Sequence, residues 1–330
     1  MKDEATGAGS VPRNGEASTD DVGVSPPGYR LPASVRLGPV HLQVTDLARS
    51  EEFYGRVLGL TRVDPDPEDG SNGGVENEAH GRGSASLGVS GGKEPLLELV
   101  EKPGATPVPR RGRLALYHFA LRVPDRVGLA RVARRLRDLD VRVGMADHKV
   151  SEALYLADPD GLGIEVYRDR PRREWRTEGG QIVMATDPLD LEGLLEEGPG
   201  DSSDGVPPGT VMGHVHLHVG DLEEAARFYH DALGFDKVVW SYPGALFLSA
   251  GGYHHHLGVN TWAAPARPPG ADEARLLHWS LVVPDATEVA GITESVRGAG
   301  YSVVDGESHG APVRLADPWG TELAVLAAAP

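Results

Sequence analysis

The 330-residue sequence contains no cysteine. A disulfide framework, a zinc–thiolate site and a cysteine nucleophile are therefore excluded, and any metal must be held by nitrogen and oxygen ligands. The sequence also has no apolar run near the roughly 20 residues needed to cross a bilayer, and its N-terminus, MKDEATGAGS, has no apolar signal core. We therefore expect a cytoplasmic protein with no membrane partner.

Positive charge is scarce, because 32 Lys and Arg residues stand against 49 Asp and Glu residues, a net charge of −17. Binding to a phosphate backbone depends on clustered basic side chains, so nucleic acid is not an expected partner. Hydrophobic residues still make up 40% of the chain, among 43 glycines and 26 prolines. This composition is typical of globular domains built from short elements with many turns.

Two polar stretches lack apolar periodicity. Residues 1–36 are rich in Gly, Pro, Ser and acidic residues, which predicts a disordered tail. Residues 171–210 contain a short apolar stretch, the helical pattern DLEGLLEE and a Gly- and Pro-rich end, and we interpret them as a linker. The predicted domains are therefore an N-terminal one at 37–170 and a C-terminal one at 211–330.

An internal repeat sets the architecture. The segment GPVHLQVTDLARSEEFYGRVLGL, from Gly38, aligns without gaps with GHVHLHVGDLEEAARFYHDALGF, from Gly213. Likewise LYHFALRVPD, from Leu116, aligns with LLHWSLVVPD, from Leu276, and a helical pattern and then ADPDG or ADPWG follow each. A repeat of this kind indicates duplicated structural units. The four modules cover residues 38–103, 114–170, 211–263 and 275–327.

Each module opens with alternating apolar residues, the pattern of a half-buried strand. An Asp follows, placed to accept hydrogen bonds from the free N–H groups at the start of a helix. These capping residues are Asp46, Asp125, Asp221 and Asp285. Short strands separated by Gly, Pro and Asp come after each helix, so the unit is βαβββ and the fold class is α+β.

These motifs resemble those of a known family. Four βαβββ units, a histidine before the capping Asp and DPDGLGIE in a last strand are similar to the vicinal oxygen chelate superfamily. The segments YHFALRVPD, SEALYLADPDGLGIEVYRDRP, DLEGLLEE, MGHVHLHVGDL and SAGGYHHHLGVNTW further resemble bacterial catechol 2,3-dioxygenases of the type I extradiol class. The resemblance implies two glyoxalase/bleomycin-resistance/dioxygenase-type domains. It also implies an oxidoreductase of aromatic hydrocarbon catabolism, with mononuclear Fe(II), or Mn(II) as the alternative, acting on a catecholic diol and O₂.

The resemblance implies two histidine ligands and one glutamate, a set that suits non-haem Fe(II) because it leaves positions open for substrate. The family's ligand histidine precedes the capping Asp by seven residues. His118, His214 and His278 meet this spacing, whereas the first module has Pro39 there. Three histidines therefore meet the spacing, whereas the resemblance implies only two histidine ligands.

The ligand glutamate of the family follows the Asp of the DPxG motif by seven residues, a spacing that Glu165 meets. The fourth module has Ala324 there, and Glu322 lies two residues earlier. Register favours His118, Glu165 and His214, which requires modules two and three to pair across the linker. The set His214, His278 and Glu322 stays open.

The run His254–His256 lies in the third module, and the resemblance assigns the acid–base role to His255. Histidine suits this role because its charge changes near neutral pH. Strand alternation would place His255 on the face opposite its neighbours, although such a run could also be a surface feature. Tyr155, ten residues before Glu165, matches a tyrosine that hydrogen-bonds the substrate in related enzymes, with a buried core tyrosine as the alternative. His148, in the preceding loop, could reach the same pocket.

The histidines of HVHLHV share one strand face because apolar residues alternate with them. We expect His216 and His218 to orient ligands or contact substrate. Candidates for an aromatic substrate pocket are Trp240, Tyr242, Phe247 and Trp262. No positional argument applies to His80, His230 and His309, which are expected at the surface.

Two other functions stay open. A glyoxalase-type isomerase usually needs four protein ligands, but HHHLGVNTW offers Asn260 and no carboxylate for the fourth. A non-catalytic small-molecule-binding protein, such as an antibiotic-sequestering one, would need no ligands. The sequence does not give the oligomeric state, for which a homo-oligomer is an open option.

Overall fold

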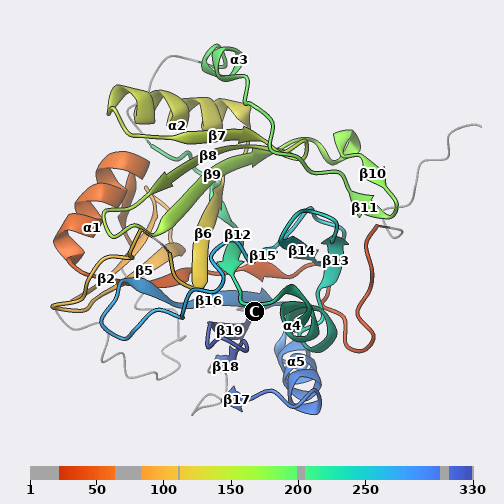
Figure 1. Ribbon diagram of the computed structural model, residues 1–330. Helices are drawn as coiled ribbons and strands as arrows, with labels where there is room; N and C mark the ends of the chain where they lie inside the picture. The colour runs from red at the N-terminus through yellow and green to blue at the C-terminus, as the bar shows by residue number, and fades with distance from the viewer. Residues whose placement is uncertain (1–21, 64–82, 111, 199–204, 305–311, 329–330) are drawn as a thin grey trace, which may run out of the picture.

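Each predicted module begins with the strand and capped helix that its sequence pattern indicates. In the computed structural model, which describes residues 22–63, 83–110, 112–198, 205–304 and 312–328, all four modules run strand, helix and three further strands (Figure 1). The four capping Asp side chains each accept a hydrogen bond from a backbone N–H of the first helical turn. The predicted α+β fold of four βαβββ modules is therefore confirmed.

One sheet combines the second and third modules, in the strand order β13-β14-β15-β12-β6-β9-β8-β7. The second module supplies β6 (Ala115–Arg122), β7 (Gly144–Asp147), β8 (Ser151–Ala157) and β9 (Gly163–Asp169). The third supplies β12 (Val211–His218), β13 (Asp236–Val239), β14 (Ala245–Ser249) and β15 (Leu257–Asn260). The antiparallel pair β6–β12 joins the two halves at the centre of the sheet.

The other sheet combines the first and fourth modules, in the order β17-β18-β19-β16-β2-β5-β4-β3, with β1 also paired to β16. The N-terminal strands are β1 (Arg36–Leu37), β2 (Val40–Val44), β3 (Leu60–Arg62), β4 (Ser84–Val89) and β5 (Pro95–Glu101). The C-terminal strands are β16 (Arg275–Val283), β17 (Val303–Val304), β18 (Val313–Ala316) and β19 (Glu322–Ala327). Each sheet therefore takes strands from both predicted domains, 37–170 and 211–330. The domain boundaries themselves stay a prediction from the sequence.

The helices are short, as the many turn residues indicate. In modules one and three, α1 (Leu47–Phe53) and α4 (Leu222–Ala226) continue into the π-helical turns η2 (Tyr54–Leu58) and η5 (Arg227–Ala232). Modules two and four carry α2 (Arg126–Asp138) and α5 (Ala286–Gly298). Across the described residues, no helix combines the length and the apolar character that crossing a membrane requires.

Two buried tyrosines join consecutive modules. The Tyr54 hydroxyl donates to Asp158 Oδ2 over 3.1 Å, and the Tyr229 hydroxyl donates to Asp317 Oδ2 over 2.9 Å. Both rings are fully buried, and both carboxylates lie in the DPxG turns of the following module. Because a buried polar group needs a partner, these bonds hold the helical segments of modules one and three against those turns.

Residues 22–36 are packed, so the prediction of a disordered tail over 1–36 is wrong for this part. Leu31 is 3% exposed and donates its N–H to the carbonyl oxygen of Gly234. Arg30 forms a 2.8 Å ion pair with the buried Asp236. The apolar residues here follow no period because they pack where η5 meets β13 in the third module rather than forming a helix or strand of their own. Residues 1–21 lie outside the described residues.

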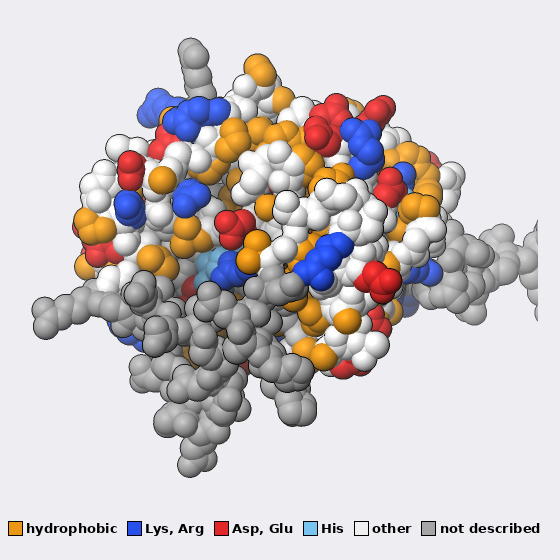
Figure 2. Space-filling view, turned by 90° about the horizontal axis from the view of Figure 1, so that it is seen from below, with side chains coloured by type: hydrophobic (Ala, Val, Ile, Leu, Met, Phe, Trp, Pro, Cys, Tyr) orange, Lys and Arg blue, Asp and Glu red, His pale blue; other side chains and the backbone are white. Residues whose placement is uncertain are grey.

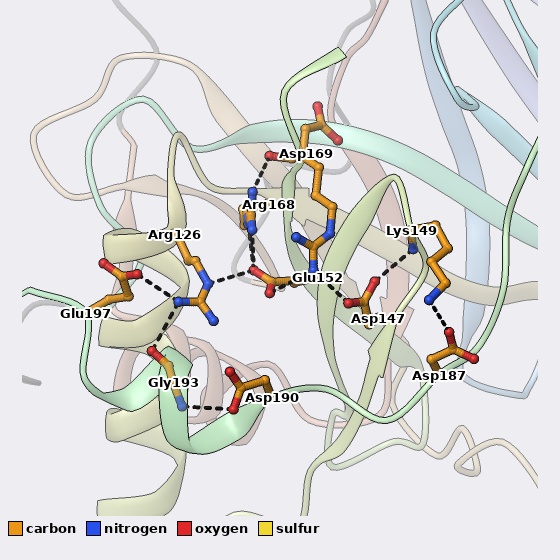
Figure 3. Close-up of polar contacts among 11 residues, drawn as sticks. Arg126, Asp147, Lys149, Glu152, Arg168, Asp169, Asp187, Asp190, Gly193 and Glu197 are labelled. Carbon is orange, nitrogen blue, oxygen red and sulfur yellow. Dashed lines mark hydrogen bonds and ion pairs between the residues drawn. The ribbon is translucent and has the colours of Figure 1, made fainter. Parts of the chain in front are cut away.

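Residues 171–198 are more than a linker. They form the turn η4 (Arg172–Glu174), the hairpin β10 (Thr177–Glu178) and β11 (Gln181–Ile182), and the helix α3 (Leu191–Leu195). Leu194 is fully buried against α2, and α2 and α3 lie together at one edge of the molecule (Figure 1). The segment is polar because its partners are charged: Arg126 on α2 donates to the carbonyl oxygen of Gly193 and to Glu197 (Figure 3).

A buried carboxylate lies at the centre of this network (Figure 3). Glu152, on β8, is 2% exposed and accepts hydrogen bonds from Arg126, Arg168 and Arg170 over 2.7–3.1 Å. We expect Glu152→Gln to lower the free energy of unfolding by about 2–4 kcal/mol, because three guanidinium groups lose their anion. Urea denaturation measures this. Glu178→Gln, at an exposed ion pair, should change stability by less than about 0.5 kcal/mol, and equal losses in the two variants would contradict the role of burial.

Basic and acidic side chains are interspersed with hydrophobic ones on the face shown in Figure 2. The described part of this face presents no broad basic surface of the kind that binds a phosphate backbone. The buried histidine and carboxylate side chains that could bind a metal lie instead within the sheet of modules two and three.

Candidate metal centre and cavity

Three side chains converge from neighbouring strands at the centre of the second–third-module sheet. Ala120, on β6, pairs with Glu165 on β9 and with His214 on β12, so these two side chains share a face. His118 lies two residues before Ala120 and points the same way. His118 Nε2 lies 2.9 Å from Glu165 Oε2 and 3.3 Å from His214 Nε2, and the third edge of the triangle is 3.0 Å.

This triangle fits a metal ion. Two ligands that bind one ion at right angles with bonds of about 2.1 Å lie about 3 Å apart, which matches its edges. All three side chains are buried, with at most 4% exposure. Within the described residues they are the single group of three His, Asp or Glu residues whose ligand atoms come this close. Two nitrogens and one carboxylate oxygen on one side of a point leave the other side free for substrate.

The charge states also suit a cation. Burial lowers the pKa of His214 to about 4, against the opposing charge of Glu165, so the imidazole is neutral and keeps a free lone pair. Burial alone would raise the pKa of Glu165, but the hydrogen bonds and charges of the two histidines hold it well below its usual range. A neutral imidazole and an ionised carboxylate are the forms in which these groups bind metals.

The alternative ligand set is not brought together. His278 lies on β16 in the other sheet and stacks on His41, with ring centroids 3.7 Å apart. Glu322 is exposed on β19 and lies 3.8 Å from Arg314. Because β12 pairs with β6 and not with β16, His214 lies in a different sheet from both residues.

His278 should make stability depend on pH. Burial, with the charges of His41 and Arg314, lowers its pKa to about 2, below the unfolded value of 6.5. The unfolded chain therefore takes up a proton below pH 6.5 that the folded chain excludes, and stability is lost as pH falls. Between pH 7 and pH 5 the wild type should lose about 2 kcal/mol more than His278→Gln in urea denaturation. Equal losses in the two proteins would show that His278 is not held neutral.

A cavity of about 410 Å³ adjoins the three converging side chains, a size in the range of small-molecule sites. Most of the residues proposed from the sequence line it, together with several that were not. The lining side chains with polar or aromatic groups are Tyr117, His118, His148, Tyr155, Glu165, Thr186, His214, His216, Tyr242, Phe247, His255 and Trp262. No Lys or Arg is among the described residues that line it.

Two proposed substrate-binding residues lie outside this lining. The Trp240 ring is 39% exposed at the end of β13, and its backbone N–H binds Gln181. His218 lies further along β12, where its Nδ1 is 2.7 Å from Asn260 Oδ1. His216, one pleat earlier, does line the cavity, and its Nε2 accepts from Asn260 Nδ2 over 2.9 Å. The histidine side chains of HVHLHV share a face as predicted, but the cavity covers only the part of that face with His214 and His216.

Tyr155 and His148 form a hydrogen-bonded pair in the cavity wall. Tyr155 pairs directly with Glu165 across β8 and β9, which directs both side chains to the cavity. His148 Nδ1 donates to the carbonyl oxygen of Ala185 over 2.6 Å, so its Nε2 accepts from the Tyr155 hydroxyl, also over 2.6 Å. Burial and the charge of Glu165 raise the pKa of Tyr155 well above 10. The side chain is therefore a neutral phenol beside the three converging side chains.

No motif in the sequence predicts the side of the cavity formed by Met184, Ala185 and Thr186. These residues lie in the segment interpreted as a linker, where the Thr186 hydroxyl contacts the Tyr242 hydroxyl over 2.8 Å. The apolar stretch QIVMA was the available signal, because a linker has no reason to carry buried apolar residues. Met145 belongs to no motif, and Tyr117 opens the segment YHFALRVPD but was given no role there.

The histidine run occupies a turn and not a strand, so the alternation argument does not apply to it. Each ring nevertheless has its own surroundings. His255 is 5% exposed and lines the cavity, with its ring centroid 4.1 Å from that of His214. His254 is fully buried behind it, and the partly buried His256 faces a second cavity, of about 1130 Å³. Burial first, and then the charges of neighbouring histidines, lower the pKa of His255 well below 6.5.

His230 was expected at the surface, and that prediction is wrong. It is 3% exposed in η5, and its Nδ1 donates to the carbonyl oxygen of Phe235 over 2.6 Å. This hydrogen bond ties the π-helical turn to the chain that follows it, because Phe235 lies three residues after the end of η5. His80 and His309 lie outside the described residues.

The comparisons with known proteins agree with this architecture. The model of the Glyoxalase/Bleomycin resistance protein/Dioxygenase superfamily matches residues 36–166 and 211–325. The chain is 42% identical over 286 residues, 86% of its length, to "Catechol-2,3-dioxygenase" of Bacillus subtilis (strain 168), of which it covers 93%. It is 29% identical over 136 residues to "Putative ring-cleaving dioxygenase MhqA" of the same organism, covering 41% of this chain and 40% of that protein.

Solved structures show the same fold. A putative dioxygenase from Bacillus subtilis superposes with a TM-score of 0.59 at 16% identity, covering 92% of this chain and 87% of that one. A glyoxalase I mutant from Zea mays superposes with a TM-score of 0.53 at 16% identity, covering 89% and 94%. The resemblance noted in the sequence is confirmed, and the chain belongs to the Glyoxalase/Bleomycin resistance protein/Dioxygenase superfamily.

Proposed function

We propose that this chain is an extradiol ring-cleaving dioxygenase that acts on a catechol-type diol with O₂. The observation that carries the proposal is the buried triangle of His118, Glu165 and His214 in the wall of a cavity of about 410 Å³. The 42% identity to a protein named catechol-2,3-dioxygenase, over 93% of that protein, supports the same activity. Both lines of support point to an oxidoreductase with a small aromatic substrate.

The donor set favours Fe(II). Two imidazoles and one carboxylate on one face of an ion are typical of non-haem Fe(II) oxygenases, whereas an all-oxygen site would favour Mg²⁺, Ca²⁺ or Mn²⁺. His118, Glu165 and His214 would hold the ion, and Fe(II) would supply open positions for the diol and O₂ and a path for electrons between them. Mn(II) is the alternative ion, and metal analysis of anaerobically purified protein distinguishes the two.

The chain's own residues bind the diol and move its proton. His255 is neutral and lines the cavity, so its free nitrogen can take the proton of a diol hydroxyl. The Tyr155 hydroxyl can hydrogen-bond a diol oxygen, and His148 holds the phenol in place. Phe247 and Trp262 provide apolar surface for the ring. The cavity thus combines a base, a hydrogen-bonding group and an aromatic wall around one open face.

Product analysis tests the proposal. Anaerobically purified, iron-loaded protein should convert catechol under air to a yellow ring-opened semialdehyde, with one O₂ consumed per diol. Phenol or a monomethylated catechol should give no product, because one of the two chelating oxygens is missing or blocked. A colourless dicarboxylic acid would instead show cleavage between the two oxygens and contradict the assignment. Turnover of a glutathione hemithioacetal without catechol cleavage would favour an isomerase.

Tyr155→Phe should lower turnover of catechol by about 10–100-fold, since a hydrogen bond to a charged group contributes about 1.5–3 kcal/mol. Iron content should not change, because the phenol is not one of the three converging ligands. Steady-state kinetics with metal analysis measures both quantities. Tyr301→Phe is the matched control, because it removes a hydroxyl from a ring that packs on Phe228, away from the cavity. Equal turnover in the two variants would remove Tyr155 from the site.

A further inference from the structure

A chain of hydrogen bonds leads away from His255 on the side opposite the cavity. His255 Nδ1 lies 2.8 Å from His254 Nδ1, and His254 Nε2 lies 2.7 Å from Asp169 Oδ1. His254 has no exposed surface and His255 has 5%, so water does not compete for these nitrogens. Asp169 ends β9, four residues after Glu165, which places the carboxylate just beyond the metal ligands.

The chain fixes where the protons are. An ionised carboxylate only accepts, so His254 Nε2 carries the hydrogen and a neutral His254 leaves Nδ1 bare. His254 Nδ1 must then accept from His255 Nδ1, which in turn leaves His255 Nε2 without a proton. Since Nδ1 of His255 is engaged with His254, Nε2 is the nitrogen available to the cavity. A proton on His255 Nε2 would instead leave two bare Nδ1 atoms facing each other.

Asp169 has the surroundings of a permanent anion. Arg122 Nη1 lies 3.3 Å from Oδ2, and the Tyr253 hydroxyl donates to both carboxylate oxygens over 3.1 Å. Burial would raise the pKa of Asp169, but His254, Arg122 and Tyr253 together hold it below its usual value. Arg122 and Tyr253 line the cavity of about 1130 Å³, so the chain of hydrogen bonds runs from one cavity to the edge of the other.

We propose that Asp169 and His254 are positioning residues that keep His255 in the tautomer with a bare Nε2 facing the smaller cavity. The proposal rests on the proposed function, in which His255 takes the proton of the diol. When it does, that proton binds Nε2, and the Nδ1 proton of His255 can move to His254 Nδ1. The positive charge then lies beside Asp169, and the reverse transfer returns the proton. No other reactant is consumed.

The tautomers can be observed directly in the full-length chain labelled with ¹⁵N-histidine, with diamagnetic Zn(II) added or without metal. Long-range ¹H–¹⁵N correlation spectra should show His255 protonated at Nδ1, with its signal assigned by its loss in His255→Gln. In Asp169→Asn the amide can donate to His254 Nε2, which reverses both imidazoles and places a proton on His255 Nε2. Asp169→Glu should restore the original tautomer. A wild-type His255 protonated at Nε2, or no change in Asp169→Asn, would overturn the proposal.

Steady-state kinetics of the iron-loaded protein provide a second test of the proposal. Asp169→Asn should lower kcat for catechol by about 10²–10⁴-fold, as expected for a base held in the wrong tautomer, with KM and iron content unchanged. The loss should shrink for a nitrocatechol, which is already ionised at neutral pH and does not need the base. Tyr253→Phe removes one donor to Asp169 but leaves Arg122 and the chain from Asp169 to His255 in place, so its kcat should stay within about threefold of wild type.

The outcomes separate the two proposals. Wild-type protein that leaves catechol unchanged would contradict the proposed function, while the spectra would still decide the tautomer. Active wild-type protein with an unchanged kcat in Asp169→Asn would overturn the positioning role alone. An equal loss for catechol and nitrocatechol in Asp169→Asn would indicate a structural effect and would also overturn it.

Discussion

The variants His118→Ala, Glu165→Ala and His214→Ala should each purify with little or no bound iron. Each removes one corner of a triangle whose three edges are 2.9–3.3 Å, and two remaining ligands cannot hold one face of the ion. Removing a residue that merely orients a metal ligand costs about 10–100-fold in affinity or activity, so loss of a ligand should lower catechol turnover by roughly three orders of magnitude or more. Metal analysis after anaerobic purification and oxygen-uptake assays measure the two effects.

His278→Ala is the matched control for these variants. Its histidine has the same spacing to the capping Asp as His118, and it is also buried, at 7% exposure. It lies in the other sheet, stacked on His41, so its loss should leave iron content unchanged. Full iron in Glu165→Ala together with loss of iron in His278→Ala would move the metal to the first–fourth-module sheet and contradict the ligand assignment.

His255→Gln should keep its iron and lose turnover by about two to four orders of magnitude, the span associated with a general acid or base. The glutamine side chain retains hydrogen-bonding capacity but cannot carry a proton between substrate and solvent near neutral pH. Stopped assays with catechol and metal analysis of the same preparation check both statements.

His256→Gln is the control for this prediction, because His256 is the next residue but faces the larger cavity. Its turnover should stay close to that of wild type. Unchanged turnover in His255→Gln, or an equal loss in the two variants, would remove His255 from the reaction.

The fold could be predicted because the chain repeats its own pattern. Strand alternation, a capping Asp and a helical period recur four times, and each recurrence supports the others. The packing of residues 22–36 could not be predicted, because Leu31 and Arg30 bind the third module through contacts that follow no sequence period. The packing of the polar segment 171–198 could not be predicted for the same reason, because its contacts with charged side chains follow no sequence period.

The candidate ligands could be predicted from their spacing in the sequence, because residues at equivalent positions of paired strands lie side by side in a sheet. Glu165 and His214 both pair with Ala120 in this way. Which modules pair could not be read from spacing, since the sequence of each module would allow either partner. His218 was assigned to the cavity from strand alternation and Trp240 from its aromatic side chain, and neither argument says where a cavity ends. Asp169 was missed because its role depends on a turn, at His254, that brings it a partner 85 residues away in the chain.

The pairing of the outer modules with each other also constrains how the chain can be made. His41 on β2 faces His278 on β16, about 240 residues later, whereas the central pair β6–β12 joins residues about 100 apart. During synthesis the first module is therefore made long before β16, and one edge of β2 stays unpaired until β16 follows. The sheet that holds the three converging side chains can form much earlier. Contacts so distant in the chain slow folding, and an unpaired edge strand invites pairing with other chains. A chain that stops before Arg275 should therefore aggregate, even though all three candidate metal ligands are present in it.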